Sequence, residues 1–378
     1  MYKRQELGLS DDYFNYRFIG NDSRAALDYV LGSKYFVASK NDSFKVPYGY
    51  SLVDGSDKKY DIYSTEHALP ISFACSKVIS ADEYSSMSML EKQEALTKGC
   101  IIENGESNVD VDMATTSKNV EVISSDGVLI EGNTLIATKS NATIQVRLNQ
   151  QDNAENYFCI ENFEFEDITP STLRELTGKS SSELNLKQQW NEAKRQPARN
   201  AVVNIDDGEA KQNITLSTPR DNGYGGKVDW AIRLFSRNDT ITIEFERTGK
   251  YTFDKMYSSS QPLETIVSNA DDLALSDTVD TSFEEDKVKS TVSSSSEDKR
   301  WIFYSIPYSS GWSATIDGEP AEIVKADIAF MAVQVDGNDH EIVLTYETPG
   351  IRVGFICMIA GFVALVGVLI FRVKRIKA

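Results

Sequence analysis

Histidine and cysteine are scarce in this sequence, which has two histidines and four cysteines among 378 residues. Cys75, Cys100 and Cys159 precede a long apolar run, Cys357 lies inside that run, and no pair has C-x-x-C spacing. Three outer cysteines cannot all pair, so neither a disulfide framework nor a zinc site is supported. A single bridge between Cys75 and Cys100 stays open as an alternative, and we expect no metal and no cofactor.

Catalytic signatures are also missing. The sequence contains no HExxH, no GxSxG and no Walker motif. His67 and His340 are far apart, and neither has a neighbour at metal-ligand spacing. We predict that both are structural, and that His340 is half-buried on a strand where it alternates with Ile342 and Leu344.

Three other features could carry chemistry but have simpler explanations. The glycines at residues 223–226 could cradle a phosphate, yet no helix or Walker lysine follows them, so we predict a loop. The carboxylate pairs Asp110/Asp112 and Asp206/Asp207 could serve a glycosidase, but such pairs are common on acidic surfaces. The 4 Trp, 17 Tyr and 17 Phe residues could build a sugar-stacking platform, although core packing explains them equally well. We therefore predict no catalytic residue in this chain.

The charges are unevenly distributed along the chain. All 57 acidic residues precede residue 350, whereas the whole chain has 39 basic residues. An acidic body argues against nucleic acid or anionic lipid as a partner. The acidic composition is otherwise typical of a solvated surface.

One apolar run organises the rest of the chain. Val353 to Phe371 is uncharged and is followed by Arg372, Lys374, Arg375 and Lys377. A helix of this length spans the hydrocarbon core of a bilayer, so we predict a transmembrane helix at 353–371. Basic residues are retained in the cytoplasm, which predicts a cytoplasmic tail at 372–378 and an extracytoplasmic body.

The beginning of the chain has no feature that would carry such a body across a membrane. Residues from Met1 onward are polar and acidic, without the apolar segment of a signal peptide. We interpret the chain as the C-terminal part of a multi-spanning protein. Gly354, Cys357, Gly361 and Ala364 share one face of the predicted helix, and we expect this face to pack against upstream transmembrane helices of the same protein.

Before the apolar run, alternating patterns predict a mainly β protein. Short strands with turn residues between them are typical of antiparallel sandwiches, as in the clean alternation of Ile241, Ile243 and Phe245. Helices are expected at 23–31, at the surface over 81–98, and within 170–197, and the polar stretch 258–280 suggests a boundary. The predicted regions are an α/β lead-in at 1–70, a larger β-sandwich with helical insertions at 71–260 and a small β-sandwich at 261–350.

The segment Ser305-Ile-Pro-Tyr-Ser-Ser-Gly-Trp-Ser-Ala-Thr-Ile-Asp-Gly318 resembles the C-terminal signature of the YfhO family of bacterial membrane proteins. Downstream, Gly337-Asn-Asp-His340-Glu-Ile342 and Tyr346-Glu-Thr-Pro-Gly350 resemble the family's next elements. Upstream, Leu31-Gly-Ser-Lys-Tyr-Phe-Val37 and Ala68-Leu-Pro70 do so as well. The signature residues, which we expect to be structural or to lie on the acceptor side, are Pro307, Tyr308, Gly311, Trp312, Asp317, Gly318, His340 and Tyr346.

This resemblance implies a function for the parent protein. The family resembles GT-C glycosyltransferases of the bacterial cell membrane, which move a sugar from a polyprenyl-phosphate donor to cell-surface polymers. In that class the catalytic carboxylate lies in an N-terminal outer loop, so the resemblance transfers no catalytic residue to this sequence. The chain would then bind the acceptor glycan or have a structural role. A membrane-anchored carbohydrate-binding or adhesion module is the alternative, and a free-standing glycosidase is a third.

Overall fold

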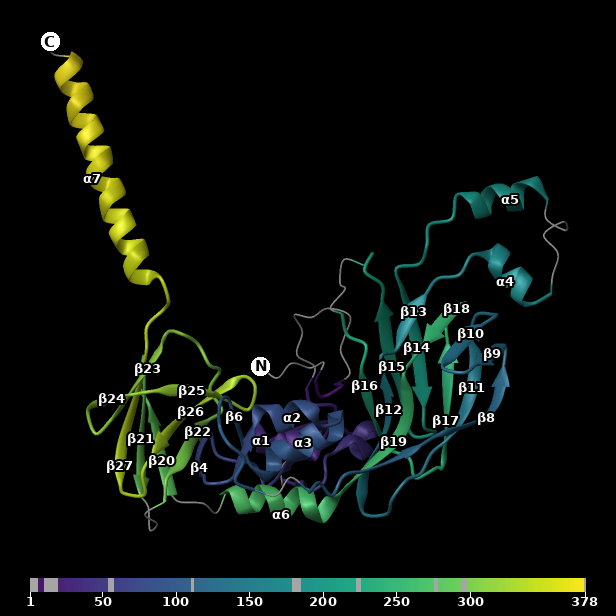
Figure 1. The fold of residues 1–378 in the computed structure, drawn as a ribbon, viewed down its shortest axis with the longest axis horizontal. Helices are drawn as coiled ribbons and strands as arrows, with labels where there is room; N and C mark the ends of the chain where they lie inside the picture. Colours follow the sequence, from purple (N-terminus) through teal and green to yellow (C-terminus); the bar gives the residue numbers. More distant parts are fainter. Residues whose placement is uncertain are drawn as a thin grey trace. The chain divides into compact units, whose positions relative to one another are not determined.

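The computed structural model describes residues 6–9, 20–53, 58–109, 112–178, 185–221, 226–274, 278–293 and 298–376. They form two compact units, Met1–Ile71 with Lys77–Leu275 and Ser72–Ser76 with Ser276–Ala378. Most elements are strands, accompanied by a few helices and one C-terminal apolar helix (Figure 1), which confirms the predicted mainly β class. The division between units falls near residue 275, whereas the sequence suggested a division near residue 260.

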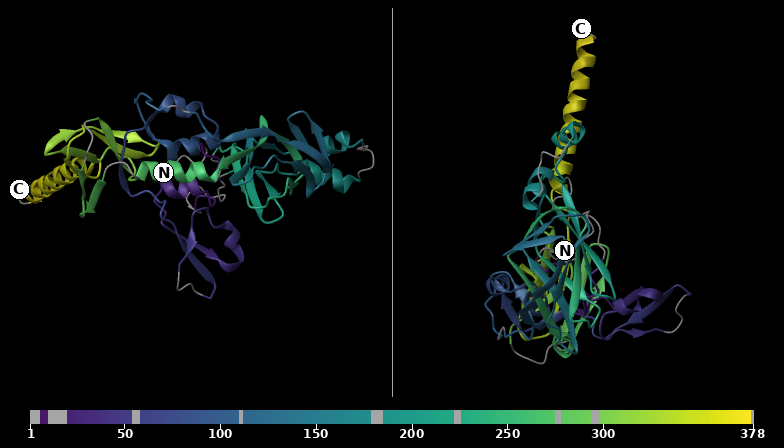
Figure 2. Two further views of the ribbon diagram at one scale, coloured as in Figure 1. Left: turned by 90° about the horizontal axis from the view of Figure 1, so that it is seen from below. Right: turned by 90° about the vertical axis from the view of Figure 1, so that its right-hand side faces the viewer.

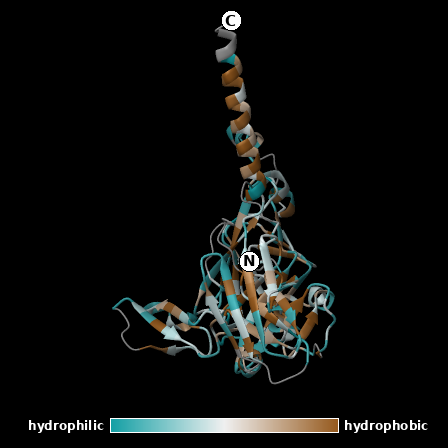
Figure 3. Ribbon diagram, turned by 90° about the vertical axis from the view of Figure 1, so that its left-hand side faces the viewer, coloured by the Kyte–Doolittle hydropathy of each residue, from teal (hydrophilic) through white to brown (hydrophobic). Residues whose placement is uncertain are grey.

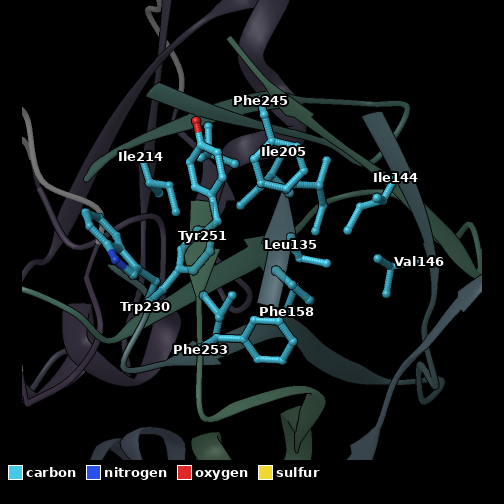
Figure 4. Close-up of a cluster of buried hydrophobic side chains, with 14 of the residues drawn as sticks. Leu135, Ile144, Val146, Phe158, Ile205, Ile214, Trp230, Phe245, Tyr251 and Phe253 are labelled. Carbon is cyan, nitrogen blue, oxygen red and sulfur yellow. The ribbon is translucent and has the colours of Figure 1, made fainter. Parts of the chain in front are cut away.

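Three antiparallel sheets of the first unit surround one apolar core. The first sheet has the strand order β15 (Lys211–Ser217), β14 (Asn200–Asp206), β17 (Thr240–Phe245), β11 (Ala142–Arg147), β8 (Glu121–Asp126). The second has the order β16 (Trp230–Leu234), β12 (Ala154–Glu161), β19 (Lys255–Pro262), β7 (Thr116–Asn119). The third has the order β13 (Glu164–Glu166), β18 (Gly249–Thr252), β10 (Thr134–Ala137), β9 (Val128–Glu131). Figure 4 shows Phe158, Phe245 and Tyr251 among the side chains that meet between the sheets. Along β17 every second residue is buried, as its alternation predicted.

Helices cover the other face of β12 and β16. Phe158 and Ile160 face the sandwich core, whereas Tyr157 and Cys159 pack against Met89 and other residues of a separate apolar cluster. This second layer contains α1 (Ala25–Val30), α3 (Met89–Lys98) and α6 (Leu263–Ala274), which contact one another. Because both faces of β12 are covered, its sequence is apolar at consecutive positions.

The helix predicted at 81–98 is two helices, and the second is not a surface helix. The first helix, α2 (Ala81–Ser86), ends at Ser86, and Ser88 caps the second, α3, through reciprocal hydrogen bonds with Glu91. Gln93 is fully buried and donates to Tyr157 Oη at 3.2 Å and to Gln261 Oε1 at 2.6 Å. The polar composition of α3 therefore reflects internal hydrogen bonds rather than exposure.

The stretch 258–280, where the sequence suggests a boundary, contains the division between the two units, but most of it is folded into a strand and a helix. Strand β19 and helix α6 occupy most of this stretch, and Ser258, Ser259 and Ser260 are buried in a sheet between β12 and β7. The Ser259 hydroxyl donates to the Thr116 carbonyl oxygen at 3.1 Å. Buried hydroxyls that find such acceptors are tolerated in a core strand, so a polar composition did not mark a linker.

Two buried charged side chains lie at helix α1, Arg24 just before its first residue and Asp28 within it. The guanidinium of Arg24 is fully buried and donates to the carbonyl oxygens of Leu7 at 2.7 Å and Gly8 at 3.1 Å. Asp28 accepts from the Asn21 side chain at 2.7 Å. Burial, together with the charge of Glu155, raises the pKa of Asp28 to about 6, although the bond from Asn21 opposes this shift.

The remaining parts of the first unit are small. A three-stranded sheet in the order β1 (Tyr35–Ser39), β3 (Tyr60–Ser64), β2 (Ser51–Leu52) adjoins the 3₁₀ helix η1 (Lys40–Lys45), and Figure 2 shows it in purple beside the helices. The helical excursion predicted within 170–197 is confirmed as α4 (Pro170–Leu176) and α5 (Leu186–Ala193). Strands β5 (Val78–Ser80) and β6 (Cys100–Ile102) pair in parallel.

The second unit packs two antiparallel layers around its own core. One sheet has the order β20 (Thr278–Phe283), β21 (Lys287–Ser293), β27 (His340–Tyr346), β23 (Trp312–Ile316), β24 (Glu319–Ala321). The facing strands are β4 (Ser72–Cys75), β22 (Arg300–Tyr304), β26 (Phe330–Val335) and β25 (Ile323–Ala326). Ala314, Ile342 and Leu344 of the first layer meet Ile302 and Val333 of the second. Strand β4 was not expected here, because more than 200 residues separate it from β22.

The chain ends in helix α7 (Ile351–Ile376). Its segment Ile351–Arg372 is long and apolar enough to cross a membrane. Every residue in this segment is exposed, and the ribbon in Figure 3 is largely brown along it, the colour of hydrophobic residues. An exposed apolar helix of this length is the form that a membrane span takes when it is seen without its bilayer.

Candidate functional site

The family-like signature residues gather on β23, on β27 and in the loops beside them, in the unit that carries α7. Trp312 and Tyr346 form a cross-strand pair, with ring centroids 5.0 Å apart. The loop before β23 holds Tyr308, whose amide donates to the Ala329 carbonyl oxygen at 2.8 Å and whose side chain is exposed. Pro307 is exposed beside it. The motif is therefore partly exposed, at Pro307 and Tyr308, and partly packed against the core of this unit, at Trp312.

Gly311 allows the two strands to meet closely. Its carbonyl oxygen accepts from the Glu347 amide at 2.9 Å. A Cβ atom at this position would overlap the Glu347 carbonyl oxygen and would lie 2.8 Å from Tyr346 Cε2. Only glycine fits without a shift of the backbone, which explains this residue of the motif.

The Asp317-Gly318 pair forms the hairpin turn that the sequence predicted. Both residues have positive φ, 51° and 86°, as a tight hairpin turn between β23 and β24 requires. The Asp317 carboxylate also accepts from the Glu341 amide at 2.9 Å. Asp317 thus serves both as a turn residue and as a bridge to β27.

His340 is held between two carboxylates. Its Nδ1 lies 2.7 Å from Asp317 Oδ2, and its Nε2 lies 2.6 Å from Asp336 Oδ1. Burial of the ring lowers its pKa, but the two carboxylates outweigh this effect, so the pKa is raised. The hydrogen bonds from His340 and the Asn338 amide hold the pKa of Asp336 at about 2. This arrangement favours an imidazolium that donates through both nitrogens.

This cluster is suited to positioning rather than to catalysis. A histidine with both nitrogens bound to carboxylates has no free lone pair for a substrate proton. Among the described residues, no group of three or more His, Cys, Asp or Glu side chains is placed to hold a metal ion. Asp336 was not singled out in the sequence, although its place four residues before His340 on a turn was an available signal.

The signature region is tied to the start of α7. Arg352 Nη2 donates to Glu347 Oε2 at 2.6 Å, and the Ile351 amide donates to the Thr348 carbonyl oxygen at 3.2 Å. Glu347 also bonds to Gly311. The first turn of the membrane-length helix is therefore connected to the signature loop through Glu347.

The predicted packing face of α7 remains a prediction. Gly354, Cys357, Gly361 and Ala364 are all exposed, and a Cβ atom at Gly354 or Gly361 would meet no atom within 4 Å. The described residues contain no second membrane-length helix. The face is thus sterically free to receive another helix.

The other sequence candidates have structural roles or lie outside the described residues. His67 Nδ1 lies 2.7 Å from Asp271 Oδ1 on α6. Asp110 and residues 223–225 are outside the described residues, while Asp112 is exposed. Cys75, Cys100 and Cys159 are buried thiols.

The Asp206/Asp207 pair is not arranged as a glycosidase acid and base. The Asp207 carboxylate is buried and accepts from the amides of Glu209, Ala210, Phe235 and Ser236. Asp206 accepts from the Gly208 amide at 2.8 Å. Both carboxylates therefore stabilise loops, and the third reading of the sequence, a glycosidase that depends on this pair, loses its support.

Sequence reasoning missed a polar pocket of the first unit. It has a volume of about 460 Å³ and is lined by residues 148–156 and 233–237, together with Phe44, Asp239 and Leu263. No motif marks it, because its walls come from two loops about 80 residues apart. The only signal was the density of Asn, Gln and Asp at 149–153.

Comparison with known proteins gives the family. The family model described as bacterial membrane protein YfhO matches residues 1–358. The uncharacterized protein YfhO of Bacillus subtilis (strain 168) is 22% identical over 365 residues, which are 96% of this chain and 37% of the relative. The chain therefore spans little more than a third of that relative's length.

Among solved structures, two cryo-electron microscopy structures of the arabinofuranosyltransferase AftD from Mycobacteria are similar, one of them a mutant. The mutant matches 63% of this chain and 24% of its own chain at 11% identity, and the other matches 66% and 23% at 12% identity. Both have a TM-score of 0.19, which is too low to support an inference. The family match over residues 1–358 is sufficient by itself: this chain belongs to the YfhO family of bacterial membrane proteins.

Proposed function

We propose that this chain is the extracytoplasmic part and one membrane helix of a protein that transfers a sugar from a polyprenyl-phosphate carrier to a cell-surface polymer. In this proposal the outer part binds or positions the acceptor and performs no chemistry itself. The observation that carries it is the link between the family signature and the membrane-length helix, through Gly311, Glu347 and Arg352. That link would hold the second unit at a fixed place relative to a membrane-embedded reaction centre.

The proposed orientation follows from the charges around α7. Arg372 and the lysines and arginines after it would remain in the cytoplasm, so the two β-rich units would lie outside. An impermeant maleimide should label Ser125→Cys, on an exposed edge of β8, in intact cells that express the full-length protein. Ala378→Cys should be labelled only after permeabilisation, and the reverse pattern would refute the orientation.

The non-catalytic role is supported by the hydrogen bonds of two residues that could otherwise act as acid or base. His340 and Asp207 are engaged in hydrogen bonds that hold turns and strands together. A catalytic group must be free to reach a substrate proton or bond. We therefore place the catalytic residues in the part of the full-length protein that this chain does not include.

The test is a sugar-transfer assay on the full-length protein in membrane vesicles. A radiolabelled polyprenyl-phosphate sugar is supplied, and label is measured in the polymer fraction. Deletion of the residues that correspond to this chain should abolish transfer, although the truncated protein is still present in the membrane on immunoblots. Undiminished transfer by the truncated protein would contradict the proposal.

A surface carbohydrate-binding or adhesion module is the second candidate, and the polar pocket at 148–156 favours it. The same assay separates the two functions. A full-length protein that binds surface glycan but transfers no label from any polyprenyl-phosphate sugar would be an adhesion module.

A further inference from the structure

The pocket of the first unit is built from two connections between core strands. Residues 148–153 join β11 to β12, and residues 235–239 join β16 to β17, so both loops start and end in the same sandwich. The volume of about 460 Å³ lies within the range of small-molecule sites. Loops held at both ends by a rigid core are a common place for binding residues.

Arg233 and Glu155 are the buried charged residues in its wall. Arg233 is 9% exposed and Glu155 is 3% exposed, and Arg233 Nη2 lies 3.3 Å from Glu155 Oε1. Nε and Nη1 of Arg233 have no hydrogen-bond partner among the described residues. Buried N–H groups without an acceptor cost free energy, so a ligand that brings oxygen atoms to this wall would be favoured.

Two aromatic rings add an apolar surface. Phe44, on η1, contacts Phe235 edge to face, with ring centroids 5.4 Å apart. The guanidinium carbon of Arg233 lies 5.0 Å from the Phe235 ring centroid. The pocket thus combines ring surface with hydrogen-bonding groups, as the C–H faces and hydroxyl edges of a sugar ring require.

The loops that carry these groups are held by internal hydrogen bonds. Asp207 Oδ2 accepts from the Phe235 amide at 2.6 Å and the Ser236 amide at 3.1 Å. On the facing loop, Asn156 Oδ1 accepts from the Gln151 amide at 2.9 Å, and its Nδ2 donates to the Gln151 carbonyl oxygen at 3.0 Å. A wall that is already ordered loses little entropy on binding.

The charges of the lining argue for a neutral ligand. Arg233 is paired with Glu155, and the lining also contains Arg237, Asp152 and Asp239. Two arginines and three carboxylates give no excess of positive charge, so an anionic ligand gains no net attraction. Carboxylates and amides instead accept and donate hydrogen bonds to hydroxyl groups.

We propose that this pocket binds one neutral sugar unit of a glycan. Phe44 and Phe235 contact the C–H face of the ring, Arg233 donates to a ring or hydroxyl oxygen, and Asp239 accepts from a hydroxyl at the rim. The inference deepens the proposed function, because it assigns acceptor binding to a specific site.

The experiment measures glycan binding to the whole 378-residue chain in nanodiscs by saturation-transfer NMR and calorimetry. The probes are neutral methyl glycosides of glucose, galactose and N-acetylglucosamine, the anionic probes glucuronic acid and glycerol 3-phosphate, and a neutral Gly-Ser peptide. We expect saturable binding of at least one neutral glycoside. Phe235→Ala should weaken it about tenfold or more, because a stacked ring contributes on the order of that factor.

The matched control is Phe283→Ala, which removes an exposed phenylalanine from the other unit and should leave binding unchanged. Asp239→Asn is a conservative change of an exposed side chain and should weaken binding several-fold. If circular dichroism shows that Phe235→Ala is misfolded, the binding of Asp239→Asn tests the inference instead. Three results would each overturn the inference. The chain could prefer the anionic probes or the peptide, it could bind no neutral glycoside, or it could bind one with an affinity that neither pocket variant alters.

This assay contains no polyprenyl-phosphate sugar, so it is independent of transfer. Glycan binding by a protein that transfers no sugar would leave the pocket assignment standing and refute only the proposed transfer. Transfer that survives the loss of binding would refute only the assignment of acceptor binding to this pocket.

Discussion

Asp317 and His340 join two neighbouring strands of the five-stranded sheet in the second unit, because Asp317 Oδ2 accepts from His340 Nδ1 at 2.7 Å. Asp317 begins the turn after β23, and His340 is the first residue of β27. Both belong to the family-like signature. Their role is therefore to hold the register of the strands that lead to Glu347 and α7.

This pair makes stability depend on pH. The pKa of His340 is raised above 6.5 in the folded state, so its contribution is complete below pH 6.5 and is lost as pH rises through the folded pKa. The pKa values of Asp317 and Asp336 are lowered from 3.8, so their contributions are present above pH 3.8 and are lost on acidification. The cluster should stabilise the fold most between pH 3.8 and 6.5.

Urea unfolding of the chain in detergent across this pH range measures the effect. His340→Gln should remove the part of the pH dependence that lies above pH 6.5, and Asp336→Asn should reduce it. Identical pH profiles for His340→Gln and the unmodified chain would contradict the role of the cluster.

Gly311→Val should destabilise the second unit by roughly 1–3 kcal/mol, as overpacked sites do. The added side chain would overlap the Glu347 carbonyl oxygen and crowd Tyr346. Gly318→Asn is the control, since a Cβ atom there meets no atom within 4 Å and asparagine tolerates positive φ. Equal free energies of unfolding for the two variants would show that the close approach at Gly311 is unimportant.

Asp28→Asn should stabilise the first unit at neutral pH. The pKa of Asp28 is raised from 3.8 to about 6, chiefly by burial, so its ionisation opposes folding and stability falls as pH rises from 3.8 to 6. The shift corresponds to roughly 3 kcal/mol as an upper value. Asparagine keeps an oxygen to accept from Asn21 and carries no charge.

Thermal unfolding at pH 4 and pH 8 tests this expectation. The gain from Asp28→Asn should be larger at pH 8, whereas Asp28→Ala, which loses the bond from Asn21, should gain less. A destabilised Asp28→Asn protein at pH 8 would show that the carboxylate is ionised and favourably paired.

Gly361→Leu should destabilise the full-length protein in micelles if the small-residue face of α7 packs against another membrane helix. Val366→Leu, which we place toward lipid, should have little effect on the melting temperature. Equal tolerance of leucine at the two positions would refute the packing of this face.

Periodicity in the sequence was sufficient for most strands. Ile241, Ile243 and Phe245 alternate and are buried on one face of β17, and the Asp317-Gly318 dipeptide forms the turn that its preference for positive φ predicted. These predictions succeed because the side chains of a strand alternate between its two faces and because few residues tolerate a tight hairpin turn.

Periodicity failed where polar residues are buried. Ser258 to Gln261 resemble a linker in composition but form a buried strand, and Gln93 on α3 resembles a surface residue but is fully buried. Their hydrogen-bond partners, such as Thr116 for Ser259, lie far away in the sequence. Composition cannot show whether such a partner will be present.

The sequence by itself determined the mainly β class, the membrane-length helix and the family-like signature, because each depends on residues that are close together in the chain. Only the tertiary structure decided that Asp336 joins Asp317 at His340, that β4 completes the second unit, and that Arg233 and Phe235 face residues 148–156 across a pocket. These features depend on long-range pairing of strands. The free energy of that pairing comes from cores and hydrogen bonds that no local pattern specifies.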